Sequence, residues 1–185
     1  GNVTAVGAGV AVITASTEGE NPVSATCNVI VVSEDCKITT TVDDGETSLG
    51  GSSKGPGSWY KAGSYGTVTM KDGVVTVVAD KEYNFGDDQQ IRYMPCAPGE
   101  SDFYVGTFVM VYTVTNNTDK AMTTTANLNG QSTPSRVTIE AGESVTVSFT
   151  ITVSAEESGK QLNIKLKGYG IGTVTVSDIY MVPVK

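Results

Sequence analysis

The sequence contains no histidine, and this absence excludes whole classes of chemistry. Without an imidazole there can be no Ser-His-Asp or Cys-His catalysis, and the commonest protein ligand of transition metals is missing. No stretch approaches the roughly 20 apolar residues that a membrane helix needs, and no basic-then-apolar signal peptide opens the chain. We therefore expect a mature or excised segment that does not insert into a membrane.

Charged residues are scarce as well, at 17% of the chain, and acids outnumber bases by 20 to 12. The net charge of −8 would repel a polyanion over most of the surface, so we expect no nucleic acid partner. The three cysteines, Cys27, Cys36 and Cys96, cannot all pair, and their spacing matches no zinc knuckle. Two interpretations stay open for them: buried free thiols, or a Cys27–Cys36 bridge.

Valine and threonine, in contrast, make up 51 of the 185 residues, and β-branched side chains at this density favour strands over helices. At roughly 150 residues per domain, this length predicts one domain, or one domain and a fragment. Alternation predicts strands near 66–71, 73–79, 88–94, 103–115, 120–129, 136–140, 144–153, 161–167 and 172–184, with turns at 71–73, 116–119, 140–143 and 156–159. Such spacing predicts an all-β fold, a two-sheet antiparallel β-sandwich.

The first 32 residues have a pattern of their own. Small and apolar residues alternate over 10–15 and again over 25–32, on either side of a turn at 18–22. This pattern predicts a β-hairpin with its ladder between about 9–16 and 24–32. Because a two-stranded hairpin is marginal in water, we expect it to pack on the main domain or to pair edge to edge with another chain.

The sequence GNVTAVGAG at 1–9, followed by SATC at 24–27, resembles the last strands of the bacterial group 2 immunoglobulin-like domain. Domains of that family act as spacers or adhesive stalks in surface and secreted proteins. The resemblance implies that 1–33 is the tail of an immunoglobulin-like spacer, that 34–36 is a junction, and that 37–185 is the main domain.

The main domain resembles the galactose-binding-like jelly roll of carbohydrate-binding modules of families 4, 16 and 22. The resemblance lies in the layout of five segments: a Gly-rich turn before Trp59, the strand at 89–93, the hydrophobic segment at 103–105, the run at 127–130 and the closing strand at 176–180. It implies a jelly-roll sandwich that binds polysaccharide.

Alternation also assigns candidate binding residues. Phe108, Met110, Tyr112 and Val114 mark a core face, as do Met122, Ala126 and Leu128, and Val145, Val147, Phe149, Ile151 and Val153. The complementary polar face carries Gln90, Arg92, Asn127, Asn129 and Gln131. Amides and a guanidinium suit sugar hydroxyls, although outward polar residues also simply keep a sheet soluble.

Aromatic rings in or beside loops are the second group of candidates, since a flat ring can bury the apolar face of a sugar. They are Trp59, Tyr60, Tyr83 and Phe85. A lone Trp can equally belong to the core. Trp59 follows a Gly-Pro-Gly-Ser turn, which we expect to hold it in a surface loop.

The acids gather in turns, where carboxylates are solvated, so we expect no glycosidase pair and no enzyme activity. The same oxygens can bind Ca²⁺. In the resembled families a metal commonly joins an N-terminal loop to an acid of the last strand. This implies a structural Ca²⁺ at Asp178 with Asp43, Asp44 or Glu46, and the alternative is that Asp178 is an ordinary surface acid.

The sequence therefore predicts a non-catalytic carbohydrate-binding module for a xylan- or β-glucan-type polysaccharide. We expect it in a secreted or surface-displayed bacterial protein, where it holds appended domains on their polysaccharide. The alternative is a structural or adhesive module of a bacterial surface, filament or phage particle.

Overall fold

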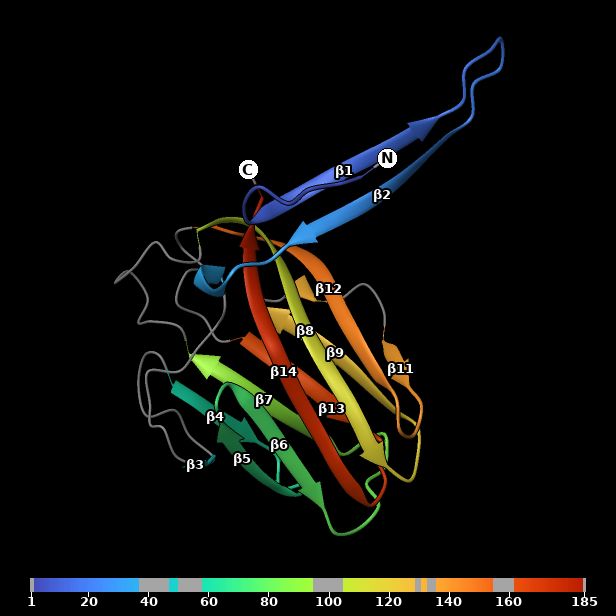
Figure 1. Ribbon diagram of the computed structural model, residues 1–185. Coiled ribbons are helices and arrows are strands. Elements are labelled where there is room, and N and C mark those ends of the chain that lie inside the picture. Colours follow the sequence, from blue (N-terminus) through green and yellow to red (C-terminus); the bar gives the residue numbers. More distant parts are fainter. Residues whose placement is uncertain are drawn as a thin grey trace.

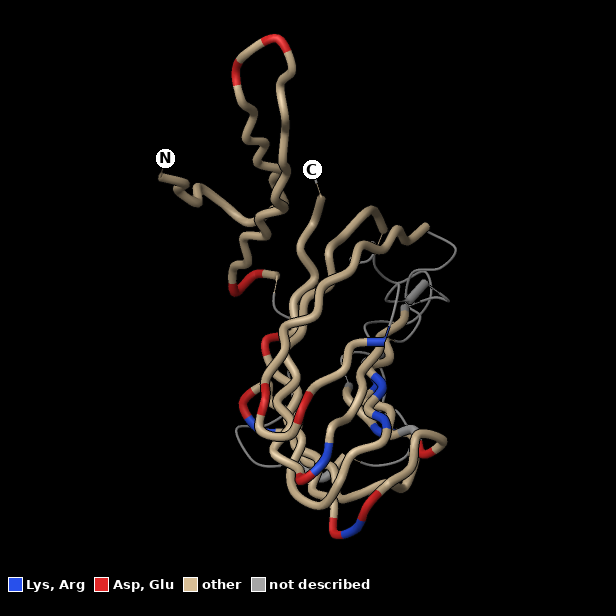
Figure 2. Tube along the Cα trace, turned by 90° about the vertical axis from the view of Figure 1, so that its right-hand side faces the viewer, with Lys and Arg blue, Asp and Glu red and all other residues tan. Residues whose placement is uncertain are grey.

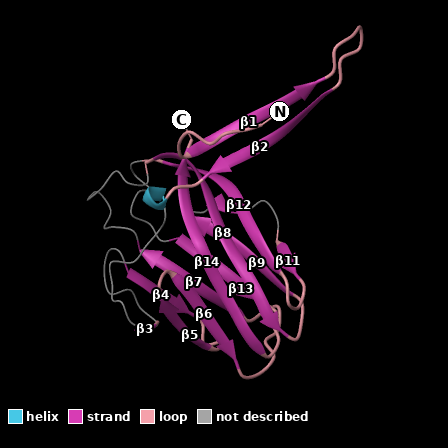
Figure 3. Cartoon of the chain, viewed as in Figure 1, coloured by secondary structure: helices cyan, strands magenta, loops and turns pink. Residues whose placement is uncertain are grey.

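The computed structural model describes residues 2–36, 47–49, 58–94, 105–128, 131–132, 136–154 and 162–184. Over these residues the chain forms two six-stranded antiparallel sheets, packed face to face, and a two-stranded hairpin that projects from one end (Figure 1). Strands dominate, and the short 3-10 helix η1 (Glu34–Cys36) follows the hairpin (Figure 3). The expected all-β, two-sheet antiparallel sandwich is confirmed.

The two sheets are named here after their long strands. The β7 sheet has the order β10-β9-β13-β7-β4, with β11 also paired to β9. Its strands are β4 (Ser58–Ala62), β7 (Asp88–Met94), β9 (Met122–Leu128), β10 (Gln131–Ser132), β11 (Val137–Ile139) and β13 (Leu162–Lys167). The β8 sheet has the order β12-β8-β14-β6-β5-β3. Its strands are β3 (Thr47–Ser48), β5 (Thr67–Lys71), β6 (Val74–Ala79), β8 (Gly106–Thr118), β12 (Ser144–Val153) and β14 (Gly172–Pro183).

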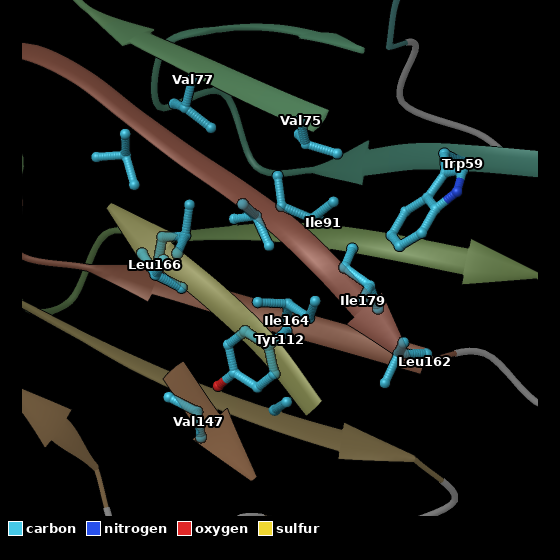
Figure 4. Packing of buried hydrophobic residues seen from close by; sticks show 14 of the residues in the cluster. Trp59, Val75, Val77, Ile91, Tyr112, Val147, Leu162, Ile164, Leu166 and Ile179 are labelled. Atoms are coloured by element: carbon cyan, nitrogen blue, oxygen red, sulfur yellow. The ribbon is translucent and has the colours of Figure 1, made fainter. Parts of the chain in front are cut away.

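One hydrophobic core fills the space between the sheets, because every strand turns its apolar side inward. Ile91, Ile164 and Ala126 pair across β7, β13 and β9 and are at most 1% exposed. From the β8 sheet, Tyr112 points into the same core (Figure 4). Its hydroxyl lies 3.3 Å from that of Thr124 in the opposite sheet, and burial raises the pKa of Tyr112 to about 12. The two sheets are thus joined by apolar packing and a satisfied polar contact.

The predicted strands agree with the structure to within a few residues, and β12 has its predicted bounds. The turn predicted at 116–119 is wrong, because β8 continues to Thr118. The buried Asn116 makes this possible. Its Nδ2 donates to the carbonyls of Lys120 and Ile139 at 2.8 and 3.1 Å, and its Oδ1 accepts from the Thr118 hydroxyl at 2.7 Å. Asparagine favours turns, but here its side chain makes hydrogen bonds to polar groups near the end of β8.

The hairpin forms with the predicted ladder. β1 (Gly9–Ser16) pairs with β2 (Ser24–Val31) from Gly9 opposite Val31 to Ser16 opposite Ser24. It does not lie along the sandwich but projects from it, meeting β14 at the base (Figure 1). Val12 and Val23 are 63% and 70% exposed. Of the two expected arrangements, packing on the main domain is confined to the base of the hairpin, and pairing with another chain stays a prediction.

Two of the cysteines are described, and both are free thiols. Cys27 is exposed because it belongs to the projecting hairpin, so the expectation of a buried thiol is wrong there. Cys36 is half-buried, and its sulfur lies 3.6 Å from the Ser33 hydroxyl. A Cys27–Cys36 bridge is excluded, and Cys96 lies outside the described residues. In the described part of the chain, no helix is long and apolar enough to cross a membrane.

We expect deletion of residues 1–32 to change the assembly of the protein rather than the fold of the sandwich. A two-stranded hairpin with exposed valines gains stability by adding a strand from another chain. Light scattering of the full chain should then show species larger than a monomer, and the deleted chain should be monomeric. An unchanged molar mass and an unchanged melting temperature after deletion would show that the segment is passive.

Candidate functional site

The outer surface of the β7 sheet carries a row of polar and aromatic side chains that crosses four adjacent strands. Tyr60 of β4 pairs with Arg92 of β7, Arg92 with Asn163 of β13, and Asn163 with Asn127 of β9. The adjacent residues Ile91, Ile164 and Ala126 are buried in the core, so the row points away from it. We call this surface the polar face. Its members by register are Tyr60, Gln90, Arg92, Thr123, Thr125, Asn127, Asn163, Lys165 and Lys167, together with Asp88 opposite Lys167 and with Arg136, the residue before β11.

Arg92 is held in place by two neighbours on the polar face. Its Nε and Nη2 donate to Oε1 of Gln90 at 3.0 and 2.6 Å. Its guanidinium carbon lies 5.9 Å from the centre of the Tyr60 ring, within the range of a cation–π contact. A guanidinium fixed in this way loses less conformational entropy when it binds a ligand.

Asn163 and Asn127 form an amide pair beside Arg92. Nδ2 of Asn163 donates to Oδ1 of Asn127 at 2.9 Å. The Oδ1 atom of Asn163 is buried and accepts no hydrogen bond in the described part of the chain. A buried acceptor without a donor costs about 1–3 kcal/mol, so this oxygen is a local cost within the amide pair.

Phe85 lies at the far end of the polar face. Its ring is 53% exposed and stands 5.6 Å from the guanidinium of Arg136, the residue before β11. The ring rests on Gly168, where an added Cβ would come within 3.0 Å of a ring carbon and the φ angle is +71°. Glycine at 168 therefore leaves room for an exposed aromatic platform next to a cation.

The other aromatic candidates have different surroundings. Trp59 was expected in a surface loop, but it lies in β4, is 5% exposed and belongs to the core. Because β4 pairs with β7, alternation turns Trp59 inward and Tyr60 outward. Trp59 is therefore not a surface platform in this structure, and Tyr60 lies buried beneath Arg92 at one end of the polar face.

Tyr83 also packs inward, with ring centres 5.6 Å from Tyr65 and 5.2 Å from Tyr169. The Tyr169 hydroxyl donates to the carbonyl of Tyr65. Burial raises the pKa of Tyr83, and the nearby Asp80 raises it further. This tyrosine cluster supports the loop that carries Phe85, so Phe85 is the exposed member of the predicted aromatic pair.

The amide candidates at the end of β9 are placed only in part. Asn129 lies outside the described residues. Gln131 pairs with Leu128, and Ser132 pairs with Asn127. The register therefore puts Ser132, not the predicted Gln131, in the row with Asn127.

Of the four predicted metal ligands, the structure describes Asp178, whereas Asp43, Asp44 and Glu46 lie outside the described residues. Asp178 is exposed, has a φ angle of +50° and sits in a bulge of β14, where the pairing with β8 shifts between Ser177 and Tyr180. Its Oδ2 accepts from the Ser177 hydroxyl at 3.0 Å. Among the described residues, no cluster of three or more His, Cys, Asp or Glu residues could hold a metal ion.

Sequence reasoning missed four members of the polar face: Asn163, Lys165, Lys167 and Arg136. In β13 the apolar residues Leu162, Ile164 and Leu166 alternate with Asn163, Lys165 and Lys167, which was a sufficient signal for the face. That β13 would pair between β7 and β9 was not evident, because the strand order of a sandwich depends on contacts far apart in sequence.

The outer surface of the β8 sheet differs from the polar face. Ser144, Thr115, Thr175, Thr76 and Thr69 form a row across five strands. Neighbouring hydroxyls pair with each other, as in Thr115 with Ser144 at 2.7 Å and Thr113 with Thr146 at 3.0 Å. Hydroxyls that satisfy one another across strands are typical of sheet stabilisation. Amides and guanidinium groups gather instead on the β7 sheet.

No family model and no curated protein matches the chain. Among solved structures, one described as "CBM4 structure and function" matches with a TM-score of 0.48 and 15% identity, over 76% of this chain and 95% of that one. TmCBM61 in complex with beta-1,4-galactotriose matches with a TM-score of 0.42 and 12% identity, over 66% and 86%. The CBM22-1-GH10 modules of the Clostridium thermocellum endo-1,4-beta-D-xylanase 10B, complexed with xylohexaose, match with a TM-score of 0.41 and 13% identity, over 77% and 26%.

These structural neighbours are carbohydrate-binding modules. At such identities and scores the likeness carries no argument about ligand or activity. The resemblance of residues 1–32 to an immunoglobulin-like domain is not tested by them and stays a prediction.

The different environments of Trp59 and Phe85 predict different costs of truncation. Replacing the buried Trp59 with alanine should destabilise the protein by about 3–5 kcal/mol, because it opens a cavity in the core. Replacing Phe85 with alanine should cost about 1 kcal/mol or less, since half of that ring is already in water. Urea unfolding of the two variants measures both values, and equal costs would contradict the assignment.

Proposed function

We propose that the main domain is a non-catalytic carbohydrate-binding module that binds a polysaccharide on the polar face. The observation that carries this proposal is the row of Tyr60, Arg92, Asn163 and Asn127 across four strands. Sugar hydroxyls both donate and accept hydrogen bonds, so they need partners that do the same. Asparagine and glutamine amides supply both functions, and the guanidinium adds a planar set of donors.

An extended polysaccharide would cross several of these groups at once. Adjacent strands lie about 4.8 Å apart, so the row from Tyr60 to Asn127 spans roughly 14 Å. The exposed ring of Phe85 would contact the apolar face of a sugar farther along the chain. A xylan- or β-glucan-type chain is the ligand that the layout of the sequence favours, and the polar face agrees with a chain rather than a single sugar.

The placement of the acids supports a binding role without catalysis. Glycoside hydrolysis needs two carboxyl groups held about 5–10 Å apart across the bond that breaks. On the polar face, the register places one acid, Asp88, among Arg and Lys residues, and no pair of acids among the described residues. We infer that the domain raises the local concentration of an appended domain on its polysaccharide, outside the cell or on its surface.

A structural or adhesive module is the second candidate, and the exposed hairpin favours it. Both outer edges of β1 and β2 are available in the described structure to add a strand, which is how filaments and surface assemblies link their subunits. Binding to any glycan supports the first candidate. Assembly through the hairpin, without binding to any glycan, supports the second.

Replacing Arg92 with alanine should weaken glycan binding by on the order of 1–3 kcal/mol, because sugar oxygens would lose their donor. Affinity electrophoresis in gels that contain xylan, β-glucan or galactan measures the effect as lost retardation. Lys71→Ala, at an exposed position of β5 in the β8 sheet, is the matched control and should bind as the parent does. Retardation that survives Arg92→Ala in a folded variant would move binding to another surface.

We also propose a structural Ca²⁺ at Asp178, since its carboxylate is exposed in a bulge of the last strand. Ca²⁺ bound to the folded state alone would raise the melting temperature. Addition of a chelator should therefore lower the melting temperature, and Asp178→Asn should abolish the difference. A melting curve that is indifferent to chelator and to added Ca²⁺ would make Asp178 an ordinary surface acid.

A further inference from the structure

Charge is distributed unevenly over the molecule, and the polar face has the opposite sign to the whole. The chain carries a net charge of −8. Nevertheless, the charged side chains described on the polar face are all cations, namely Arg92, Arg136, Lys165 and Lys167. In Figure 2 Lys and Arg residues gather along one of the two layers of the sandwich. The register also puts one acidic residue, Asp88, in this face, directly opposite Lys167.

The other acids that the structure describes lie elsewhere. They occupy the hairpin loop, η1, the turns between strands and the bulge of β14 (Figure 2): Glu18, Glu20, Glu34, Asp35, Asp72, Asp80, Glu82, Asp87, Asp119, Glu140, Glu143 and Asp178. A neutral sugar needs no such separation, because amides and hydroxyls satisfy its hydroxyl groups. A concentration of cations on a binding surface is instead complementary to an anionic ligand.

The cations are spread out rather than clustered at one point. Arg92 is in β7, Lys165 is in the middle strand β13, and Arg136 adjoins β11 on the far side of β9. With strands about 4.8 Å apart, β7 and β11 are separated by three strand spacings, or roughly 14 Å. This distribution suits negative charges that recur along a polymer better than a single small anion.

Among the described cations of the polar face, the two arginines have the geometry that suits a carboxylate best. Arg92 is oriented by Gln90 and Tyr60, and Arg136 stands over the ring of Phe85. A guanidinium presents two parallel N–H groups that match the two oxygens of a carboxylate. The adjacent amides Asn127 and Asn163 would meanwhile bind hydroxyl groups, so the face offers both functions that an acidic sugar requires.

We propose that the polar face binds a polysaccharide in which a fraction of the sugars carry carboxylates, that is, a uronate-containing glycan. This inference rests on the proposed carbohydrate-binding function and names its ligand class. A nucleic acid suits the molecule less well, because its dense phosphates would meet the acidic remainder of the surface. Phe85 is an exposed ring beside Arg136, whereas single-stranded nucleic acid needs several stacking platforms.

The decisive experiment compares one polysaccharide with and without its charge. Glucuronoxylan and the same glucuronoxylan after chemical reduction of its carboxyl groups share a backbone and differ in the carboxylates. Isothermal titration at low salt should show about tenfold tighter binding of the native polymer, since charge-assisted hydrogen bonds are roughly twice as strong as neutral ones. The difference should shrink as salt rises, because exposed charges are screened over about 10 Å at 0.1 M ionic strength.

Variants test which residues are responsible. Arg136→Gln should lose most of the preference for native over reduced glucuronoxylan, measured as the ratio of the two affinities. Lys71→Gln removes one positive charge from an exposed position of the β8 sheet and should keep the full preference. A melting temperature equal to that of the parent shows that each variant is folded.

The outcomes distinguish failure of this inference from failure of the proposed carbohydrate-binding function. Equal affinity for native and reduced glucuronoxylan would overturn the inference and leave carbohydrate binding intact. Binding to neither of these polymers, nor to β-glucan or galactan, would overturn both. Equally tight binding of single-stranded DNA, lost in Arg136→Gln, would also overturn the inference, because the face would then be a general polyanion site.

Discussion

The register of β13 between β7 and β9 is the constraint on which the rest of the structure depends. Ile91, Ile164 and Ala126 must all face the core, and successive residues of a strand point to opposite sides. The residues next to them, Arg92 and Asn163 among them, are thereby brought into one row outside. A slip of β13 by one residue would bury Asn163 and Lys165 and expose Ile164, at a large cost in free energy. The packing of the core therefore also positions the candidate site.

The same constraint explains which parts of the fold could be predicted from the sequence. Long strands such as β12 were predicted with their bounds, because apolar and polar residues alternate along them in step with buried and exposed positions. Short strands such as β4 were not, since Trp59 follows turn residues and only its pairing with β7 makes it a strand residue. Asn116 misled for a related reason. Its amide donates to the carbonyls of Lys120 and Ile139. The local sequence pattern does not predict such tertiary hydrogen bonds.

The candidate site was predictable to a similar degree. Gln90, Arg92 and Asn127 were placed on one face by alternation, and the structure brings them together on the polar face. Asn163 could not be added to them without the strand order, because it is far from them in sequence and adjacent only through pairing. Which aromatic residues are exposed could not be predicted either. Alternation divides the residues of a strand between two faces, but it does not say which face is outside.

The net charge of the chain is a poor guide to the charge at a binding surface. A total of −8 is a sum over the whole surface, whereas a ligand responds to the charges within about a screening length of its own atoms. With acids in the turns and Arg92 and Arg136 on the polar face, the molecule is attractive to an anion at one surface and repulsive elsewhere. Such an arrangement opposes a densely charged polymer, which must approach the acidic regions too, more than a polymer with sparse carboxylates. The acidic excess can therefore add specificity to the cationic face, because specificity is a difference between affinities and repulsion of the wrong partner contributes to it.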